Sequence, residues 1–486
     1  MSAPASDTGT AAPAASGDAT VNDLPLLPRE RIWGFWGHSS VNIGLAIATW
    51  AFLQGGAVAF YVGAKAAIAT TVIGYGVSVL LVALAPCIPS ARYGIEQFLA
   101  MRTVFGANGA RIVMIVVSAL LAAAWSAVLA IMFGHALSNV LVHGFGLHVS
   151  QSGMAVSLIG LAAVAFSWLV LVRGPVSVEW VNKIVAPGLV IVTLGMLVLI
   201  FTRTSWSQLT AAPALGASGD HHMDFMLALE LNVAGGFAWW PNVGNLARLT
   251  KTTRAAFWPN MIGLFLTSVL AAVVGAFAAL VLSSEDPTVW MVPLGGVVLG
   301  VIALVFVGFA NVTSIVAQGY SSMVALKGGG GRGLRRLPWP MMGAVLLVPA
   351  AILVFFPGAV YDNYSQFVSW GAILLAPLCA VQIVDYFILR RQKLRLRDLY
   401  RTDAGSRYAF WRGYNPVAFI AVAAGAVCYA LLLNPVSYEP APAFAYLTAS
   451  MPSVVVAGAL YYVLTKLVVR RLGKGGYDDA AEPARD

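Results

Sequence analysis

The residues best suited to chemistry lie inside long apolar runs rather than in polar loops. The segment GGFAWWPNVGNLARLTK, residues 235–251, contains two glycines, two tryptophans, a proline and two asparagines at the end of such a run. Glycine and proline permit a membrane helix to unwind, and the backbone groups freed there need a cavity or a ligand as a partner. The segment therefore indicates a binding site in an interrupted helix. An ordinary kinked helix is the alternative, because both residues are common in membrane helices.

Glu230 is the carboxylate that the sequence places well inside an apolar run. It lies seven residues into its span, on the order of 10 Å along a helix that rises ~1.5 Å per residue. An ionisable group at that depth is costly and by default marks a functional site. Glu230 could accept hydrogen bonds from a ligand N–H or carry a proton, and a position in a water-filled vestibule is the alternative to both.

Composition requires lipid around the chain. Of 486 residues, 59% are hydrophobic and 10% are charged, and the mean hydropathy is +0.81. A soluble protein of this size could not bury so much apolar surface. The six histidines and three cysteines show no ligand spacing, and no phosphate-binding G-x-x-x-x-G-K-[ST] motif is present. We therefore predict no cofactor, no metal beyond a transported cation, and no enzymatic activity.

Twelve apolar stretches reach the ~17 residues that a membrane-spanning helix needs. The predicted spans are 35–57, 66–88, 112–139, 153–172, 180–201, 224–245, 257–282, 292–324, 340–357, 366–389, 415–434 and 443–468. With a cytoplasmic N-terminus, all Lys and Arg residues except Lys65 and Arg203 fall on the cytoplasmic side or at its edge. This orientation places both termini in the cytoplasm and explains the net charge of +9 without a nucleic-acid partner.

An internal repeat is indicated by two similar segments. SSVNIGLAIATWAF (39–52) and LNVAGGFAWWPNVG (231–244) both contain glycine and asparagine, and they stand five predicted helices apart. Because five is odd, the two halves would insert with opposite orientation. Corresponding interrupted helices in inverted halves indicate a transporter site near the middle of the bilayer.

The most specific motif lies late in the chain, in APLCAVQIVDYFILRRQKLRLRDLYR (376–401) and YAFWRGYNPVAF (408–419). It resembles the nucleobase:cation symporter-1 family, which comprises permeases for cytosine, purines, uracil, allantoin and hydantoins. RYGIEQFLAMRTVFGANG (92–109), WVNKIVAP (180–187) and ANVTS (310–314) match the family in order and placement. The resemblance covers about residues 29 to 425.

The resemblance implies an all-α polytopic membrane protein with a 5+5 inverted repeat of the leucine-transporter type and two C-terminal helices. The resulting division is a disordered tail at 1–28, a first repeat at 29–205, a second repeat at 220–392, a loop and two helices at 393–470, and a second tail at 471–486. Both tails are expected in the cytoplasm, and the protein is expected in the inner (plasma) membrane.

The resemblance also implies where a flat ring would bind. Relatives hold the ring between an aromatic residue of helix 3 and one of helix 6, and Trp125 and Phe237 stand at these positions. Of Trp239 and Trp240, one would line the cavity while the other packs. The family's amide positions hold Ala48, Leu129 and Gly319, so nearby amides such as Asn311 would substitute. The predicted substrate-binding set is Ala48, Trp125, Glu230, Phe237, Asn242 and Gln318.

A cation site is the second implication of the resemblance. In relatives, sodium lies between unwound helix 1 and helix 8, and Ala310, Thr313 and Ser314 match the helix 8 ligands. Their spacing places all three on one helical face, and Gly44 and Ile47 would add carbonyls from helix 1. The alternative is that both hydroxyls bond back to carbonyls of their own helix. Sodium is the favoured coupling ion, with a proton carried by Glu230 as the alternative.

These observations predict a secondary transporter that imports a nucleobase or related planar heterocycle by cation symport. A symporter for a vitamin precursor or another ring compound is the nearest alternative. A membrane-embedded enzyme and a passive channel are the other classes. The first lacks an intramembrane nucleophile–base pair, and the second would need a continuous polar pore. The expected partners are the heterocycle, a monovalent cation and the lipid bilayer.

Overall fold

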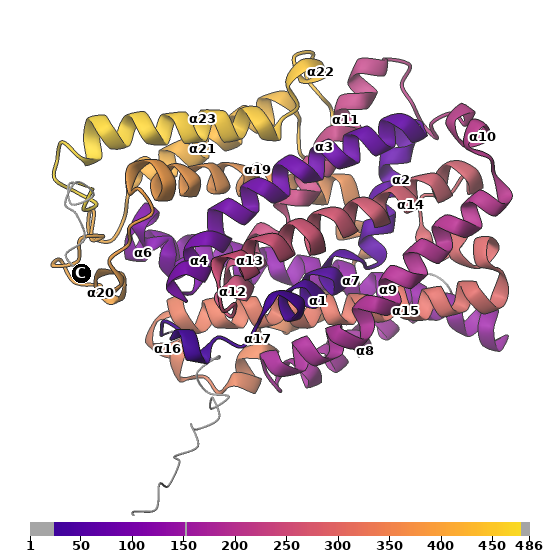
Figure 1. The fold of residues 1–486 in the computed structure, drawn as a ribbon, viewed down its shortest axis with the longest axis horizontal. Helices are drawn as coiled ribbons and strands as arrows, with labels where there is room; N and C mark the ends of the chain where they lie inside the picture. Colours follow the sequence, from indigo (N-terminus) through magenta and orange to yellow (C-terminus); the bar gives the residue numbers. More distant parts are fainter. Residues whose placement is uncertain (1–23, 151–152, 478–486) are drawn as a thin grey trace, which may run out of the picture.

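The computed structural model describes residues 24–150 and 153–477, and the regular elements within these ranges are helices. Long apolar helices lie side by side along the longest axis of the molecule (Figure 1). Eight helices in the described ranges are long and apolar enough to cross a membrane, or nine if one bent pair counts as a span. The other predicted spans fall on shorter helices, so the number twelve stays a prediction.

The first part of the chain contains the helices of the first predicted repeat. In chain order these are η1 (Pro28–Glu30), α1 (Phe35–Ala46), α2 (Thr49–Tyr61), α3 (Ala64–Val82), η2 (Ala83–Cys87), α4 (Ile88–Tyr93), α5 (Gln97–Ala100), α6 (Arg102–Met114), η3 (Ile115–Leu121), α7 (Ala122–Phe145), α8 (Met154–Leu171), α9 (Pro175–Arg203) and α10 (Trp206–Ala211). Both η2 and η3 are π-helical turns inside longer helices.

The remainder of the chain contains the second predicted repeat and the final helices. In chain order these are α11 (His221–Phe237), α12 (Trp240–Ala247), α13 (Thr253–Pro259), η4 (Asn260–Leu266), α14 (Thr267–Leu282), α15 (Pro287–Gly329), α16 (Gly331–Arg336), α17 (Trp339–Leu353), α18 (Pro357–Val360), α19 (Tyr364–Ile383), η5 (Val384–Leu389), α20 (Leu396–Tyr400), α21 (Pro416–Leu432), α22 (Phe444–Leu447), α23 (Ser450–Leu464) and η6 (Thr465–Val469).

The break between α1 and α2 is the sharpest interruption described inside a predicted span. The two helices meet at 51°, and Ile47 and Ala48 between them have extended backbone angles. The last carbonyls of α1 and the first N–H groups of α2 consequently have no partner within their own helices. The glycine in this segment serves packing, because a Cβ on Gly44 would lie 1.7 Å from Asn182 Oδ1 of α9.

The interruption between α11 and α12 is milder. Ala238 and Trp239 form a turn with backbone angles near the helical region, and Pro241 follows in the first turn of α12. The preceding glycines lie in α11 itself. A Cβ on Gly236 would lie 1.8 Å from Ser78 Oγ of α3, so this glycine permits close approach of two helices. The predicted interruption is present, but it follows the glycine pair.

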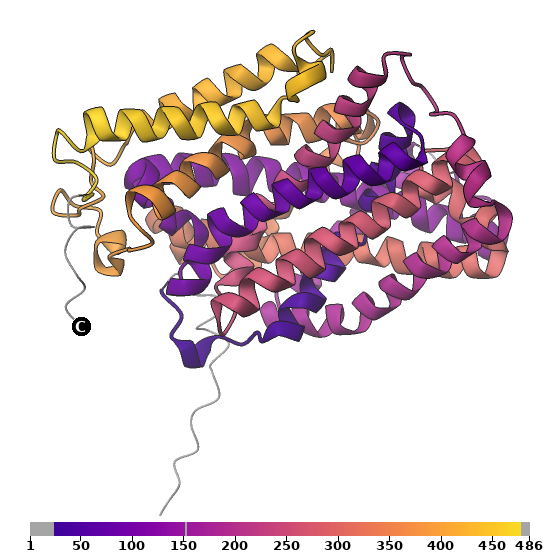
Figure 2. The ribbon, with the colours of Figure 1, turned by 45° about the horizontal axis from the view of Figure 1, so that its top comes forward.

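The helices that carry these interruptions pack into the centre of the bundle. Helix α1 packs on α9, α2 on α14 and α11, and α15 on α7 and α9. Helices α21 and α23 pair along one flank beside α19 (Figures 1 and 2). This arrangement places the last two long helices on one flank of the bundle.

The predicted tails lie only partly within the described residues. Residues 1–23 and 478–486 fall outside them. The described parts pack against the helices: Leu26 is buried and its N–H donates to Gly94 O at 2.8 Å. The Tyr477 hydroxyl is also buried and donates to Asp385 Oδ1 at 2.7 Å, beside the ion pair of Asp385 with Arg390. Leu26 and Tyr477, which lie in the two predicted tails, therefore pack against the helix bundle.

We expect Gly236→Ala to destabilise the protein by about 1–3 kcal/mol, because the new methyl group would overlap Ser78. The thermal unfolding midpoint in detergent measures this effect. Gly195→Ala is the matched control, since a Cβ there meets nothing within 4 Å. Adding Ser78→Gly to Gly236→Ala should restore part of the loss. Equal midpoints for the two single variants would contradict the close-approach role.

Candidate functional site

A small internal cavity lies where the interrupted helices meet η3, α7 and α15. It has a volume of about 30 Å³, and Leu45, Trp50, Trp125, Trp239, Asn242 and Gln318 are among the residues that line it. The α1–α2 pair, the α11–α12 pair, α7 and α15 each contribute to this wall. The two segments that the sequence predicts to be interrupted thus border one cavity.

A larger hollow on the outside of the bundle is a weaker candidate. It has a volume of about 580 Å³ and lies between α8, α9 and α15. Its walls include Phe166, Trp180 and Phe309, which are exposed apolar side chains. Hydrocarbon is the natural cover for such a surface in a membrane protein. The internal cavity is therefore the better site for a polar ligand.

Three tryptophans dominate the walls of the internal cavity. The ring of Trp50 lies 6.4 Å from that of Trp125 and 5.1 Å from that of Trp239, with interplanar angles of 81° and 72°. Trp125 is supported from another side by Phe367, with ring centroids 4.9 Å apart. Aromatic faces of this kind bind flat rings by stacking or edge-to-face contact.

The polar groups at the cavity are neutral. Asn242 Oδ1 and Trp239 Nε1 are buried and have no hydrogen-bond partner among the described residues. Gln318 Nε2 donates to Ser126 Oγ at 2.9 Å, which leaves the amide oxygen of Gln318 as an acceptor. None of the residues lining the cavity is ionisable. The site can thus accept and donate hydrogen bonds, but it offers no charge to balance a charged ligand.

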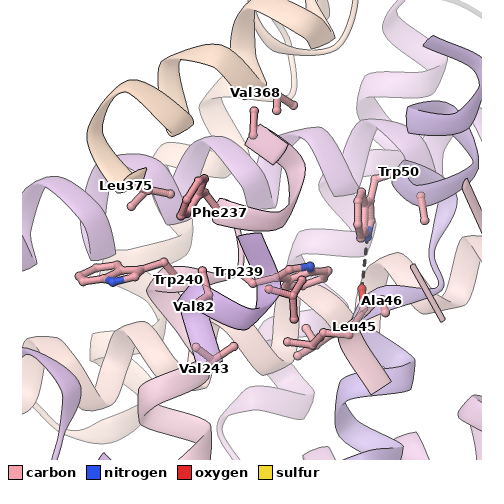
Figure 3. Packing of buried hydrophobic residues seen from close by; sticks show 14 of the residues in the cluster. Leu45, Ala46, Trp50, Val82, Phe237, Trp239, Trp240, Val243, Val368 and Leu375 are labelled. Atoms are coloured by element: carbon pink, nitrogen blue, oxygen red, sulfur yellow. Dashed lines mark hydrogen bonds between the residues drawn. The ribbon is translucent and has the colours of Figure 1, made fainter. Parts of the chain in front are cut away.

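Phe237 and Trp239 lie on different sides of the chain. Phe237 is fully buried but does not line the cavity. It lies beside Leu375, whereas Trp239 lies toward Trp50 (Figure 3). Trp240 packs elsewhere, with its indole N–H donating to Gln382 Oε1 at 3.1 Å. Trp239 therefore lines the cavity, and Phe237 does not.

Glu230 also lies away from the cavity lining. Its carboxylate accepts hydrogen bonds from the backbone N–H groups of Ala449 and Ser450, each at 3.0 Å, and from the Ser450 hydroxyl. These donors form the start of α23, where a helix presents unpaired N–H groups and the positive end of its dipole. Glu230 therefore joins α11 to one of the two flanking helices.

Of the predicted cation ligands, Ser314 and Gly44 face each other at the α1–α2 break. Ser314 Oγ of α15 lies 3.4 Å from Gly44 O, across the two helices. Thr313 Oγ1 donates to Ala310 O at 2.9 Å, within its own helix. Asn311 Nδ2 donates to Thr49 Oγ1 at 2.8 Å on the other side of the break. Ile47 and Ala48 are fully buried at the break, and neither lines the ring cavity.

Ser314 both lines the cavity and faces the Gly44 carbonyl. Among the described residues, no group of three or more His, Cys, Asp or Glu side chains could hold a metal ion. The oxygen atoms near Ser314 are hydroxyls and carbonyls, which suit a monovalent cation better than a divalent one.

Trp50 is an aromatic cavity residue that the sequence did not lead us to predict. It is the second residue of α2, two positions beyond the break. Trp239 lies within the α11–α12 interruption itself. Each of the two repeat segments contains a tryptophan near its interruption. This shared feature could have identified Trp50 as a cavity residue.

An all-helical membrane bundle in which two interrupted helices enclose a cavity is the architecture of a secondary transporter. A family model for permeases of cytosine/purines, uracil, thiamine and allantoin matches residues 27–455. The chain belongs to this family, and the resemblance in the sequence is confirmed. It is accordingly a multi-pass membrane permease, and its relatives are transporters rather than enzymes.

Curated relatives are similar over most of the chain. The purine-uracil permease NCS1 of Arabidopsis thaliana is 25% identical over 438 residues, which cover 84% of this chain and 70% of that protein. The hydantoin permease of Microbacterium maritypicum is 22% identical over 426 residues, covering 85% and 84%. The allantoin permease of Bacillus subtilis (strain 168) is 44% identical over 54 residues, which are 11% of each chain.

Solved structures show the same fold. Mhp1, a nucleobase-cation-symport-1 family transporter in a closed conformation with bromovinylhydantoin bound, has a TM-score of 0.77 at 19% identity, covering 94% of this chain and 98% of that one. A Na⁺-coupled sialic acid symporter has a TM-score of 0.57 at 11% identity, covering 93% and 90%. The predicted leucine-transporter type of fold is thus confirmed.

We expect Glu230→Ala to destabilise the protein by about 1–3 kcal/mol, because the buried N–H groups at the start of α23 would lose their acceptor. Thermal unfolding measures this, with exposed Glu439→Ala as the control. Glu230→Gln keeps an acceptor oxygen and should transport with the pH dependence of the wild type. A pH dependence abolished by Glu230→Gln would instead identify Glu230 as a proton carrier.

Proposed function

We propose that the protein imports a neutral planar heterocycle, either a nucleobase or a related ring, by cation symport through alternating access. The observation that carries the proposal is the tryptophan-lined cavity between two interrupted helices, with unpaired polar atoms in its wall. The names of the relatives, which are purine-uracil, hydantoin and allantoin permeases, support this class of substrate.

Trp125 and Trp239 are the proposed aromatic walls for the ring. Asn242 presents an amide oxygen that can accept a hydrogen bond from a ring N–H, and the Gln318 amide oxygen is a second acceptor. A buried polar atom without a partner is costly, so a ligand that pairs with Asn242 recovers this cost. The absence of ionisable residues from the wall favours a neutral ring.

Sodium is the proposed coupling ion. The Ser314 hydroxyl and the Gly44 carbonyl face each other across the helix break, and Thr313 adds a hydroxyl in the same turn of α15. The hydrogen bonds from α23 to Glu230 make this carboxylate a structural group and weaken the proton alternative. A monovalent cation that moves down the membrane potential gains about 2.3 kcal/mol per 100 mV, which is sufficient to concentrate a neutral ring.

The proposed location is the plasma membrane with both termini in the cytoplasm. The distribution of Lys and Arg supports this orientation, since Lys65 and Arg203 are the only two that the predicted topology places outside.

A thermal-shift screen of the purified protein tests the substrate class directly. The panel is cytosine, uracil, adenine, guanine, hypoxanthine, allantoin and hydantoins, each with sodium present. We expect at least one neutral ring to raise the unfolding temperature in a saturable manner. Binding of charged solutes such as amino acids, with no response to any ring in the panel, would contradict the proposal.

The aromatic walls can be tested on the ring that gives the largest shift. Trp125→Ala and Trp239→Ala should each weaken its binding by about 1–3 kcal/mol, or about 5–150-fold in Kd, because a stacking face is lost. Phe237→Leu serves as the control, because Phe237 packs outside the cavity. If Phe237→Leu weakens ring binding more than Trp239→Ala does, Phe237 rather than Trp239 forms the aromatic wall.

Coupling to sodium is tested by uptake at fixed pH with choline in place of sodium. We expect uptake to fall at least tenfold without sodium, and Thr313→Ala and Ser314→Ala to weaken the sodium dependence. The matched control is Thr193→Ala, which removes a helix-internal hydroxyl bond to Leu189 O in α9. Full uptake without sodium, with both site variants unaffected, would rule out this cation site.

A further inference from the structure

The cavity is too small for the molecule that we propose it binds. Its volume of about 30 Å³ accommodates about two water molecules, at roughly 10–15 Å³ for each. A heterocycle brings at least five ring atoms and their substituents into the same space. Because protein interiors are closely packed, at least one wall of the cavity has to move when a ring enters.

Trp50 is the wall best placed to move. Its indole touches both proposed ring walls, Trp125 and Trp239, at 72–81° to their planes. It therefore occupies part of the space that a stacked ring would need. Trp125, in contrast, is backed by Phe367 and Tyr364 at 4.9 and 6.5 Å. A ring that stacks on Trp125 would displace the Trp50 side chain before it displaced the supported one.

A single hydrogen bond ties Trp50 to the other half of the broken helix. Trp50 Nε1 donates to Leu45 O at 3.2 Å, and this bond spans the extended residues Ile47 and Ala48 (Figure 3). The distance is longer than the usual 2.9–3.0 Å of such bonds. Displacement of Trp50 breaks this bond and leaves the Leu45 carbonyl free to reorient.

The Leu45 carbonyl belongs to the turn that faces the cation position. Gly44 O precedes it and accepts from Ser314 Oγ, and Ile47 follows two residues later. Residues 44–47 form the end of α1, where carbonyls have no helical partners. A change at Leu45 therefore alters the geometry of the carbonyls proposed to bind the cation.

We propose that Trp50 is a plug that the substrate displaces, and that its displacement couples the ring cavity to the cation site through the Leu45 carbonyl. The proposal rests on the proposed function above. The ring and the cation both favour the arrangement in which Trp50 has left the cavity and residues 44–47 are released. Each ligand therefore raises the affinity for the other by the same factor, as linkage requires.

The test compares equilibrium binding of radiolabelled uracil, allantoin and benzylhydantoin in sodium chloride and in choline chloride. The variants are Trp50→Phe, which loses the N–H donor and keeps a ring, and Trp50→Ala, which empties the position. Trp290→Phe is the matched control, because Trp290 is a buried tryptophan that packs on Phe52 and does not line the cavity.

We expect wild type and Trp290→Phe to bind one of these rings at least fivefold more tightly in sodium than in choline. Trp50→Phe should lower this ratio at least threefold, because the Leu45 carbonyl no longer depends on the position of the plug. Trp50→Ala should lower it as well and should bind the bulky benzylhydantoin more tightly than the wild type does.

Two results separate the plug from the proposed function. If the wild type binds the ring more tightly in sodium and Trp50→Phe retains this effect in full, the proposed role of Trp50 is wrong. The proposed symport function is then unaffected. Loss of ring binding to Trp50→Phe in both salts would also overturn the plug, since Trp50 would then be a fixed wall. If no ring on the panel or in this experiment binds to wild type, the proposed function fails, and this inference fails with it.

Discussion

Unpaired backbone groups at the break in helix 1 are the constraint on which the rest of the site depends. Lipid cannot satisfy these groups, so protein side chains, or a ligand or water in the cavity, must do so. Trp50 donates to the Leu45 carbonyl, and Ser314 donates to the Gly44 carbonyl. These two bonds bring a tryptophan to the cavity and hold α15 against the break. The proposed ring cavity and the proposed cation position are thus neighbours, because one interruption borders both.

The two halves of the fold use their interruptions differently. The α1–α2 break is sharp and contains extended residues, so it exposes carbonyls. The α11–α12 interruption is a short turn that presents side chains instead, with Trp239 and Asn242 at the cavity. Both interrupted segments pack closely on neighbouring helices. A Cβ on Gly44 or on Gly236 would overlap the side chain of the neighbouring helix. Both halves therefore contribute to the cavity wall, with Trp50 and Trp125 from the first and Trp239 from the second.

Much of this arrangement could be predicted from the sequence, because apolar length, interrupted segments and the family resemblance are local or cumulative signals. Trp125, Asn242 and Gln318 of the predicted substrate-binding set line the cavity, and so does Ser314, which was predicted as a cation ligand. Phe237 was not placed there, because two residues along a helix turn the chain by about 200°, so Phe237 and Trp239 face opposite ways. Which of the two side chains faces the cavity depends on the residue at which α11 ends, and the sequence does not predict this residue.

Glu230 shows a second limit. Its depth in an apolar run was visible, but its partners are in α23, 220 residues away for Ser450, and only tertiary structure brings them together. The cost of a buried carboxylate is met by a helix start rather than by a ligand. The number of membrane spans also stays open, because helices such as α17 and α21 are shorter than the usual crossing length.

Transport into sealed proteoliposomes tests sodium-coupled symport of a ring most directly. Purified protein is reconstituted with no energy source except an inward sodium gradient and an inside-negative potential, and radiolabelled ring uptake is followed with time. We expect the ring that binds best to accumulate inside above its outside concentration. A sodium ionophore should abolish this accumulation. Equilibration to equal concentrations, unaffected by the ionophore, would contradict symport and indicate a passive pathway.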